Sequence, residues 1–228
     1  MKNIKKDHLF IELAITLIIP SIILMKLSEP QYLGAITSLL FALTFPLLWG
    51  IRSLIKERRV NLLAVLGLVN ILLTGGIGLL QIDTHWLAVK EAAIPGFIGL
   101  AVAISAHTRS PLVRVLLYTP TLINIDRIQR RLIKRDKVTD FEKSLKMATW
   151  MLSGAFLFSA ITNYFLAKWL VVSPAGSPAF NEELGRLTLL SYPMIALPSM
   201  LIMMGVLYFL TKTIHRLTGL KFTETLAH

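Results

Sequence analysis

The sequence contains no cysteine, which excludes disulfide bonds, thiolate chemistry and metal sites with cysteine ligands. It has neither an HExxH pair nor a serine in a nucleophile elbow, and no second histidine lies at helical spacing from His85. Gly75 and Gly76 follow no strand pattern and precede no Lys-Ser pair, so they form no phosphate-binding loop. We therefore expect no enzyme activity, no catalytic residues, no metal and no cofactor.

Acidic residues are scarce as well, with 13 Asp and Glu against 24 Lys and Arg and a formal net charge of +11. A strongly basic chain can bind nucleic acid, but here no basic stretch is interleaved with aromatic residues. Anionic lipid headgroups also attract Lys and Arg. We therefore expect the lipid bilayer and anionic phospholipids as partners, and no nucleic acid.

Apolar residues, by contrast, make up 54% of the chain, and its mean hydropathy is +0.65. A helix that rises about 1.5 Å per residue needs about 20 apolar residues to cross a hydrocarbon layer of about 30 Å. The first run has no small-residue cleavage site before Lys26, so we expect it to remain as a helix. The pattern predicts one all-α integral membrane domain over residues 1–228, a bundle of six transmembrane helices. The predicted spans are residues 9–25, 33–51, 61–81, 87–106, 147–171 and 188–211.

Basic residues are distributed unevenly among the gaps between these runs. Twenty of the 24 Lys and Arg lie before the first run, in the second and fourth gaps, or after the last run, and ten of them lie between Arg109 and Lys146. Because basic residues resist translocation, this distribution predicts that both termini and both basic gaps are cytoplasmic. The turn after the third run is only about five residues long, which predicts an antiparallel hairpin with the fourth.

Four of the runs contain proline, and the prolines of the first, second and last runs bear on the course of their helices. Pro20 removes a backbone donor in the middle of the first run, where we expect a kink. The second helix is expected to end at Pro46, Trp49 and the basic stretch RSLIKERR, residues 52–59. Pro193 and Pro198 interrupt the last run, and broken membrane helices expose backbone carbonyls at transport sites. Proline is also common in ordinary membrane helices, so both interpretations remain open.

One face of the third run is small and polar. Gly67, Asn70, Thr74, Gly78 and Gln81 recur at spacings of three or four residues, which places them along one side of a helix. Small residues let helix backbones approach closely, and Asn or Thr can form hydrogen bonds across the contact. The face is therefore explained either by close helix packing or by the lining of a polar cavity.

Two charged residues, Lys90 and Glu91, open the fourth run. Adjacent helical positions diverge by about 100°, so we expect each of the two to need its own partner. Lys90 either reaches up to the headgroups or is held by outer carboxylates in a water-filled vestibule. Asn163 either belongs to this vestibule or bridges two helices. The candidate vestibule consists of Asn70, Thr74, Gln81, Asp83, Lys90, Glu91, Asn163, Glu182 and Glu183.

The fourth gap contains an amphipathic pattern over residues 121–135. Apolar residues recur there near helical spacing with basic residues between them, which predicts a cytoplasmic helix between the fourth and fifth spans that lies on the inner leaflet. A helix that binds a partner protein is the alternative. The candidate contacts with anionic lipid are Arg127, Arg130, Arg131, Lys134 and Arg135.

A segment around the predicted hairpin resembles a known family. Two stretches resemble the central hairpin of the intracellular septation protein A family, which consists of small multi-pass bacterial inner-membrane proteins. They are TGGIGLLQIDTHWLAVK, residues 74–90, and RSPLVRVLL, residues 109–117. Glu91, Pro95 and a longer basic segment depart from that pattern, which indicates a divergent or neighbouring member. The resemblance implies a multi-pass protein of the bacterial inner membrane with a role in the cell envelope.

Two function classes follow from these features. A protein that transports a small solute or handles lipid through an outward-facing polar vestibule would account for the polar helix face and the outer charges. A membrane scaffold that recruits division or envelope-synthesis proteins would account for the amphipathic segment. Such a scaffold needs no polar cavity in the interior of the bundle. Partners within the membrane would then be further copies of this chain or membrane proteins of the envelope and division machinery.

Overall fold

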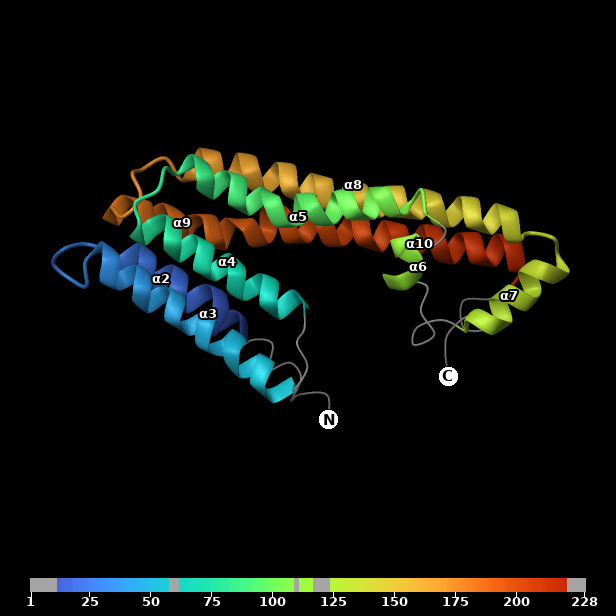
Figure 1. Ribbon diagram of the computed structural model, residues 1–228, viewed down its shortest axis with the longest axis horizontal. Helices are drawn as coiled ribbons and strands as arrows, with labels where there is room; N and C mark the ends of the chain where they lie inside the picture. Colours follow the sequence, from blue (N-terminus) through green and yellow to red (C-terminus); the bar gives the residue numbers. More distant parts are fainter. Residues whose placement is uncertain (1–11, 58–61, 109–110, 117–123, 221–228) are drawn as a thin grey trace. The chain divides into compact units, whose positions relative to one another are not determined.

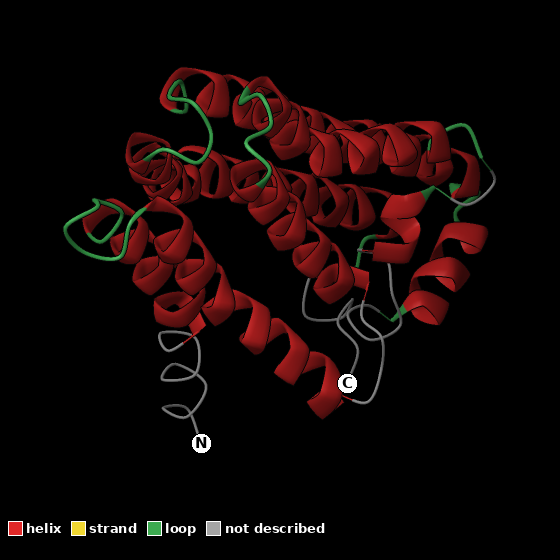
Figure 2. Cartoon of the chain, turned by 60° about the vertical axis from the view of Figure 1, so that its left-hand side comes forward, coloured by secondary structure: helices red, strands yellow, loops and turns green. Residues whose placement is uncertain are grey.

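The computed structural model describes residues 12–57, 62–108, 111–116 and 124–220, and these residues form helices, turns and loops with no strand among them (Figures 1 and 2). The all-α prediction is therefore confirmed for this part of the chain. The elements are the π-helix η1 (Ala14–Ile18), α2 (Ile19–Lys26), α3 (Ala35–Glu57), α4 (Leu62–Leu79), α5 (His85–Ser105), α6 (Leu112–Leu116), α7 (Ile125–Lys134), α8 (Val138–Leu170), α9 (Pro178–Ser191), the π-helix η2 (Tyr192–Ala196) and α10 (Leu197–Thr218).

Four helical segments are long and apolar enough to cross a membrane. They are Ala35–Arg52, His85–Ser105, Val138–Leu170 and Pro178–Thr218. Two further apolar helices, Ala14–Lys26 and Val65–Leu79, fall in the remaining predicted spans but are shorter. Residues 9–11 and 61 of those two predicted spans lie outside the described residues. The count of six spans and the orientation of the termini remain predictions.

The prolines act differently in different helices. The second predicted span, residues 33–51, agrees with the apolar segment Ala35–Arg52. The helix α3 itself continues past Pro46 and ends at Glu57, within the basic stretch. A proline costs one backbone hydrogen bond, and a long apolar helix can absorb that loss by bending.

The predicted interruption of the last run is a π-helical turn and not a break, because Pro178–Thr218 is one continuous helix. Pro193 lies in this turn, η2, and Pro198 lies in the first turn of α10. Pro20 lies in the first turn of α2, directly after the π-helix η1.

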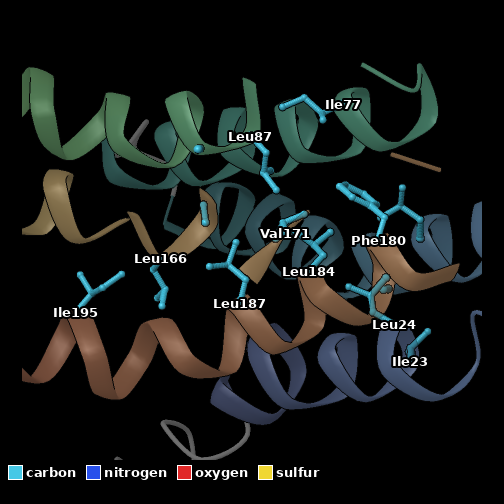
Figure 3. Packing of buried hydrophobic residues seen from close by; sticks show 14 residues of the cluster. Ile23, Leu24, Ile77, Leu87, Leu166, Val171, Phe180, Leu184, Leu187 and Ile195 are labelled. Atoms are coloured by element: carbon cyan, nitrogen blue, oxygen red, sulfur yellow. The ribbon is translucent and has the colours of Figure 1, made fainter. Parts of the chain in front are cut away.

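The chain divides into two compact units. Unit 1 comprises Met1–Ile94 and Thr162–Ile195, and unit 2 comprises Pro95–Ile161 and Ala196–His228, in each case as far as the structure describes them. In unit 1 the loops at 27–34, 80–84 and 171–177 turn at one end, and the predicted hairpin of α4 and α5 is confirmed (Figure 1). Figure 3 shows the apolar core of this unit, where α9 supplies Phe180, Leu184 and Leu187.

The apolar face of α7 is buried in unit 2. Ile128 and Leu132 are 0% and 3% exposed, and they belong to a core with Leu145 of α8 and Leu217 of α10. The prediction of a helix is confirmed for residues 125–134, whereas 121–123 lie outside the described residues. The expectation that its apolar face lies on the membrane is wrong for these two positions. The helices α8 and α10 extend beyond the predicted spans 147–171 and 188–211, and Leu145 and Leu217 of these extensions belong to the core that buries Ile128 and Leu132.

Candidate functional site in unit 1

A cavity of about 300 Å³ lies inside unit 1. It is lined by residues of η1, α2, α3, α4, α5, α8 and α9, so nearly every helix of the unit contributes to its wall. The apolar part of the wall is formed by Leu17, Pro20, Leu24, Ala42, Leu43, Pro46, Ile71, Leu184 and Leu187. The polar part is formed by Thr16, Ser21, Asn70, Thr74, Glu91, Asn163, Thr188 and Ser191.

Lys90 is buried beside this cavity, with 7% of its surface exposed. Its Nζ donates to Asn70 Oδ1 at 3.0 Å and to Thr74 Oγ1 at 2.7 Å, and it lies 2.6 Å from Glu91 Oε1. An ammonium group has three donors, so these three oxygens satisfy it completely. The long lysine chain therefore points toward α4 inside the unit and not toward the loop end of its own helix.

The expectation that Lys90 and Glu91 cannot neutralise each other is wrong. Their side chains form an ion pair, and only 6% and 22% of the respective side chains are exposed. Adjacent Cα–Cβ bonds do diverge by about 100°, but two flexible side chains can swing their charged ends back together over that angle. The pair matters more than a surface pair would, because separating buried opposite charges leaves each of them without compensation.

The structure brings together only part of the predicted vestibule. Asn70, Thr74, Glu91 and Asn163 line the cavity and Lys90 lies beside it, so five of the nine candidate residues are brought together. The other four are Gln81, Asp83, Glu182 and Glu183, which lie in or near the loops. Glu183 accepts hydrogen bonds from Val172 N and Ser173 N, both at 2.9 Å.

The three outer carboxylates expected to hold Lys90 have other partners. Asp83 Oδ1 accepts a hydrogen bond from the backbone N–H of His85 at 2.7 Å, which stabilises the turn before α5. Glu182 pairs with Arg186 one helical turn later, at 2.6 Å. Residues close to a helix end can satisfy their charges locally, and these do so, whereas a charge placed one to two turns inside a helix must find partners across the bundle.

Among the buried polar residues that the sequence did not single out, two in unit 1 are Ser21 and Asn181. Ser21 is 1% exposed, its hydroxyl has no hydrogen-bond partner in the described part of the protein, and it lines the cavity. Asn181 is fully buried, and its Nδ2 donates to Ser28 Oγ at 3.0 Å and to the carbonyl of Ala35 at 2.7 Å. Their position in apolar helices was the available signal, since a polar residue there needs a partner or a ligand.

The basic face of α7 remains open in unit 2. Of the five residues predicted to contact anionic lipid, Arg130, Arg131, Lys134 and Arg135 are exposed and Arg127 is half-buried. The N–H of Arg127 donates to the side chain of Asn124, which caps the helix. The four exposed side chains therefore present positive charge to the surroundings. Their neighbours Ile128 and Leu132 are buried and do not add to this surface.

Neither a protein-family model, nor a curated protein, nor a solved structure matches this chain. Among the described residues no group of three or more His, Asp or Glu side chains is placed to hold a metal ion. The residues of the cavity and the helices that position them are therefore the best indication of function.

Proposed function

We propose that this chain is an integral membrane protein that takes up a small polar solute or a lipid headgroup in the cavity of unit 1 as part of transport or lipid handling. The observation that carries the proposal is a cavity of about 300 Å³ with a carboxylate, two amides and five hydroxyls in its wall. Polar groups inside apolar helices cost free energy unless they have a task or a partner. A purely structural bundle would have no need of them around an open space.

The level of the cavity along its helices supports the same function. Its polar residues lie roughly five to thirteen residues from the loop end of their helices, a depth of about 8 to 20 Å at 1.5 Å per residue. In a hydrocarbon layer of about 30 Å, this depth corresponds to the middle of the bilayer. Solute sites of membrane transporters are typically found at that level, next to broken helices. Here η1 and Pro20 contribute to the cavity, and Ser191 directly precedes η2.

The absence of cysteine makes the proposal directly testable, because any introduced cysteine is the only thiol in the chain. We expect a small, charged methanethiosulfonate reagent to modify Ser191→Cys, whose side chain lines the cavity. The neighbouring Leu190→Cys, on an exposed apolar position that would face lipid, should remain unmodified. Modification at residue 191 should also abolish the activity of the protein in cells. An unreactive Ser191→Cys would show that water does not enter the cavity, which would contradict the proposed function.

The alternative proposal is a scaffold without transport, and one specific observation favours it. The exposed basic side chains of α7 form a surface suited to an anionic membrane or an acidic partner protein. A scaffold predicts that modification of Ser191→Cys leaves activity intact while neutralisation of the α7 side chains abolishes it. The assignment to the bacterial inner membrane and to envelope homeostasis is proposed on the resemblance of residues 74–90 and 109–117 alone.

A further inference from the structure

The hydroxyl groups of the cavity are available mainly as acceptors. Thr16, Thr188 and Ser191 each donate their hydroxyl hydrogen to the backbone carbonyl four residues earlier, at 2.7 to 2.9 Å. A hydroxyl oxygen that donates in this way keeps its lone pairs for another partner. These three side chains therefore offer acceptors to anything that occupies the cavity.

The carboxylate of Glu91 adds to this surplus of acceptors. Its Oε1 pairs with Lys90, and the residue lines the cavity. An ionised carboxylate accepts hydrogen bonds at about four lone-pair positions and donates none. Lys90, in contrast, offers nothing to the cavity, because Asn70, Thr74 and Glu91 already take its three hydrogens.

An unsatisfied group points to an occupant. The hydroxyl of Ser21 is buried in the cavity wall without a hydrogen-bond partner in the described part of the protein. The side-chain amide of Asn70, which also lines the cavity, uses its oxygen for Lys90, so its nitrogen is the atom that it can offer as a donor. Leaving buried polar groups unpaired costs roughly 1 to 3 kcal/mol each, so such groups in a native protein ordinarily meet a ligand or an ordered water.

The charges around the cavity restrict the class of ligand. A cation near Glu91 would be repelled by Lys90, whose Nζ is 2.6 Å from the carboxylate, and an anion would be repelled by Glu91 itself. Among the described residues, no other charged side chain lines the cavity. The wall is thus electrically balanced and rich in acceptors, which suits a neutral molecule with several donor groups.

We infer that the cavity of unit 1 binds a small, neutral solute bearing several hydroxyl groups. The inference rests on the proposed solute-binding function and specifies its ligand. The hydroxyls of the solute donate to Glu91 and to the threonine and serine oxygens, and they accept from Asn70 and Ser21. A volume of about 300 Å³ lies at the lower end of the usual range for ligand pockets, which favours a solute over a whole lipid.

Protection of the Ser191→Cys protein against modification tests this inference. The full chain is reconstituted in neutral lipid nanodiscs, and its reaction with the methanethiosulfonate reagent is followed at rising concentrations of glycerol, ethanolamine or glycolate. These probes are similarly small and carry hydroxyls, but they are neutral, cationic and anionic at neutral pH. We expect saturable protection by glycerol alone. At ten times its dissociation constant the labelling rate should fall roughly tenfold.

Two further variants make the result decisive. Ala179→Cys, on an exposed position in the first turn of α9, should react at the same rate with and without glycerol, which controls for viscosity. Ser21→Leu added to Ser191→Cys should remove the protection by filling the cavity, and Asn70→Asp, a nearly isosteric change, should weaken it by replacing a donor with an acceptor.

The failure of the inference can be distinguished from the failure of the proposed function. If Ser191→Cys reacts but only ethanolamine or glycolate protects it, the cavity binds a charged solute and the inference is overturned. If Ser191→Cys reacts and no probe protects it, the inference is overturned as well, while water access to the cavity stands. If Ser191→Cys does not react at all, both proposals fail.

Discussion

At the scale of single residues, the key feature of this protein is a lysine that is buried, paired and fully hydrogen-bonded. Lys90 has an acceptor for each of its hydrogens, on Asn70 and Thr74 of α4 and on Glu91 of its own helix. A lysine at a lipid-facing position would instead extend toward the headgroups. The arrangement therefore links α4 to α5 and holds the carboxylate of Glu91 at the cavity wall.

We expect Lys90→Met to destabilise the protein by roughly 3 kcal/mol, because it leaves the partly buried Glu91 carboxylate without its partner. The double variant Lys90→Met/Glu91→Gln should be more stable than the single one, since it removes both charges. Thermal unfolding of the purified protein in detergent measures both effects. Lys26→Met, at an exposed position, serves as the matched control and should leave stability unchanged. A Lys90→Met protein as stable as the wild type would remove this residue from the site.

At the scale of elements, glycines set how closely the helices of unit 1 approach. A Cβ atom added at Gly185 of α9 would lie 2.9 Å from the backbone oxygen of Ser21 in α2, and backbone cannot move aside as a side chain can. Gly67 and Gly78 share one predicted face of α4, but only Gly78 meets neighbours, since an added Cβ at Gly67 would have open space around it. Close packing thus explains why a glycine stands at the Gly78 end of that face. In its middle, Asn70 and Thr74 are polar because they line the cavity and bind Lys90.

We expect Gly185→Ala to destabilise unit 1 by about 1 to 3 kcal/mol, because the methyl group forces α2 away from α9. Gly67→Ala should be neutral or slightly stabilising, since alanine favours the helix over glycine by up to about 1 kcal/mol. Unfolding midpoints of the two variants, compared with that of the wild type, measure the difference. Equal midpoints for both variants would show that the contact between α2 and α9 is looser than the structure indicates.

The basic face of α7 belongs to the same scale. Because Ile128 and Leu132 are buried against α8 and α10, the exposed charges carry most of the attraction of α7 to a membrane surface, with Ile133 as its exposed large apolar side chain. We expect the triple variant Arg130→Gln/Arg131→Gln/Lys134→Gln to lose about 1 kcal/mol of binding per residue to anionic lipid. Spin-labelled anionic lipid bound to the reconstituted protein reports this loss. Raised salt should reduce the difference between variant and wild type, and an unchanged difference would indicate a contact other than charge attraction.

At the scale of the whole molecule, the distribution of charge predicts how the chain lies in the membrane. Three loops of unit 1 turn at one end of that unit, and the sequence places only two of the 24 basic residues, Lys26 and Arg186, in the predicted outer gaps. The loop between α7 and α8 lies in the gap that holds ten basic residues. Basic gaps are retained in the cytoplasm, so the two regions should be on opposite sides of the membrane.

Single cysteines test this orientation. In intact cells an impermeant thiol reagent should label Ala179→Cys at the loop end of α9, whereas Thr139→Cys at the start of α8 should react only after the cells are permeabilised. Both positions are exposed, so differences in burial do not confound the comparison. Wild-type protein, which lacks cysteine, provides the blank. The opposite pattern of labelling would reverse the predicted topology.

The helical class, the α4–α5 hairpin and the irregular turn near Pro193 follow from the sequence alone, because apolar length, turn length and proline geometry act over a few neighbouring residues. The sequence also shows that Asn70, Thr74, Lys90 and Glu91 are polar groups in apolar helices that need partners. The packing of the helices decides that Lys90 and Glu91 pair with each other, that the outer carboxylates bind elsewhere, and that Ser21 lines the cavity. Those outcomes depend on which helices meet and how far flexible side chains reach across the contact, and neither is encoded in local spacing.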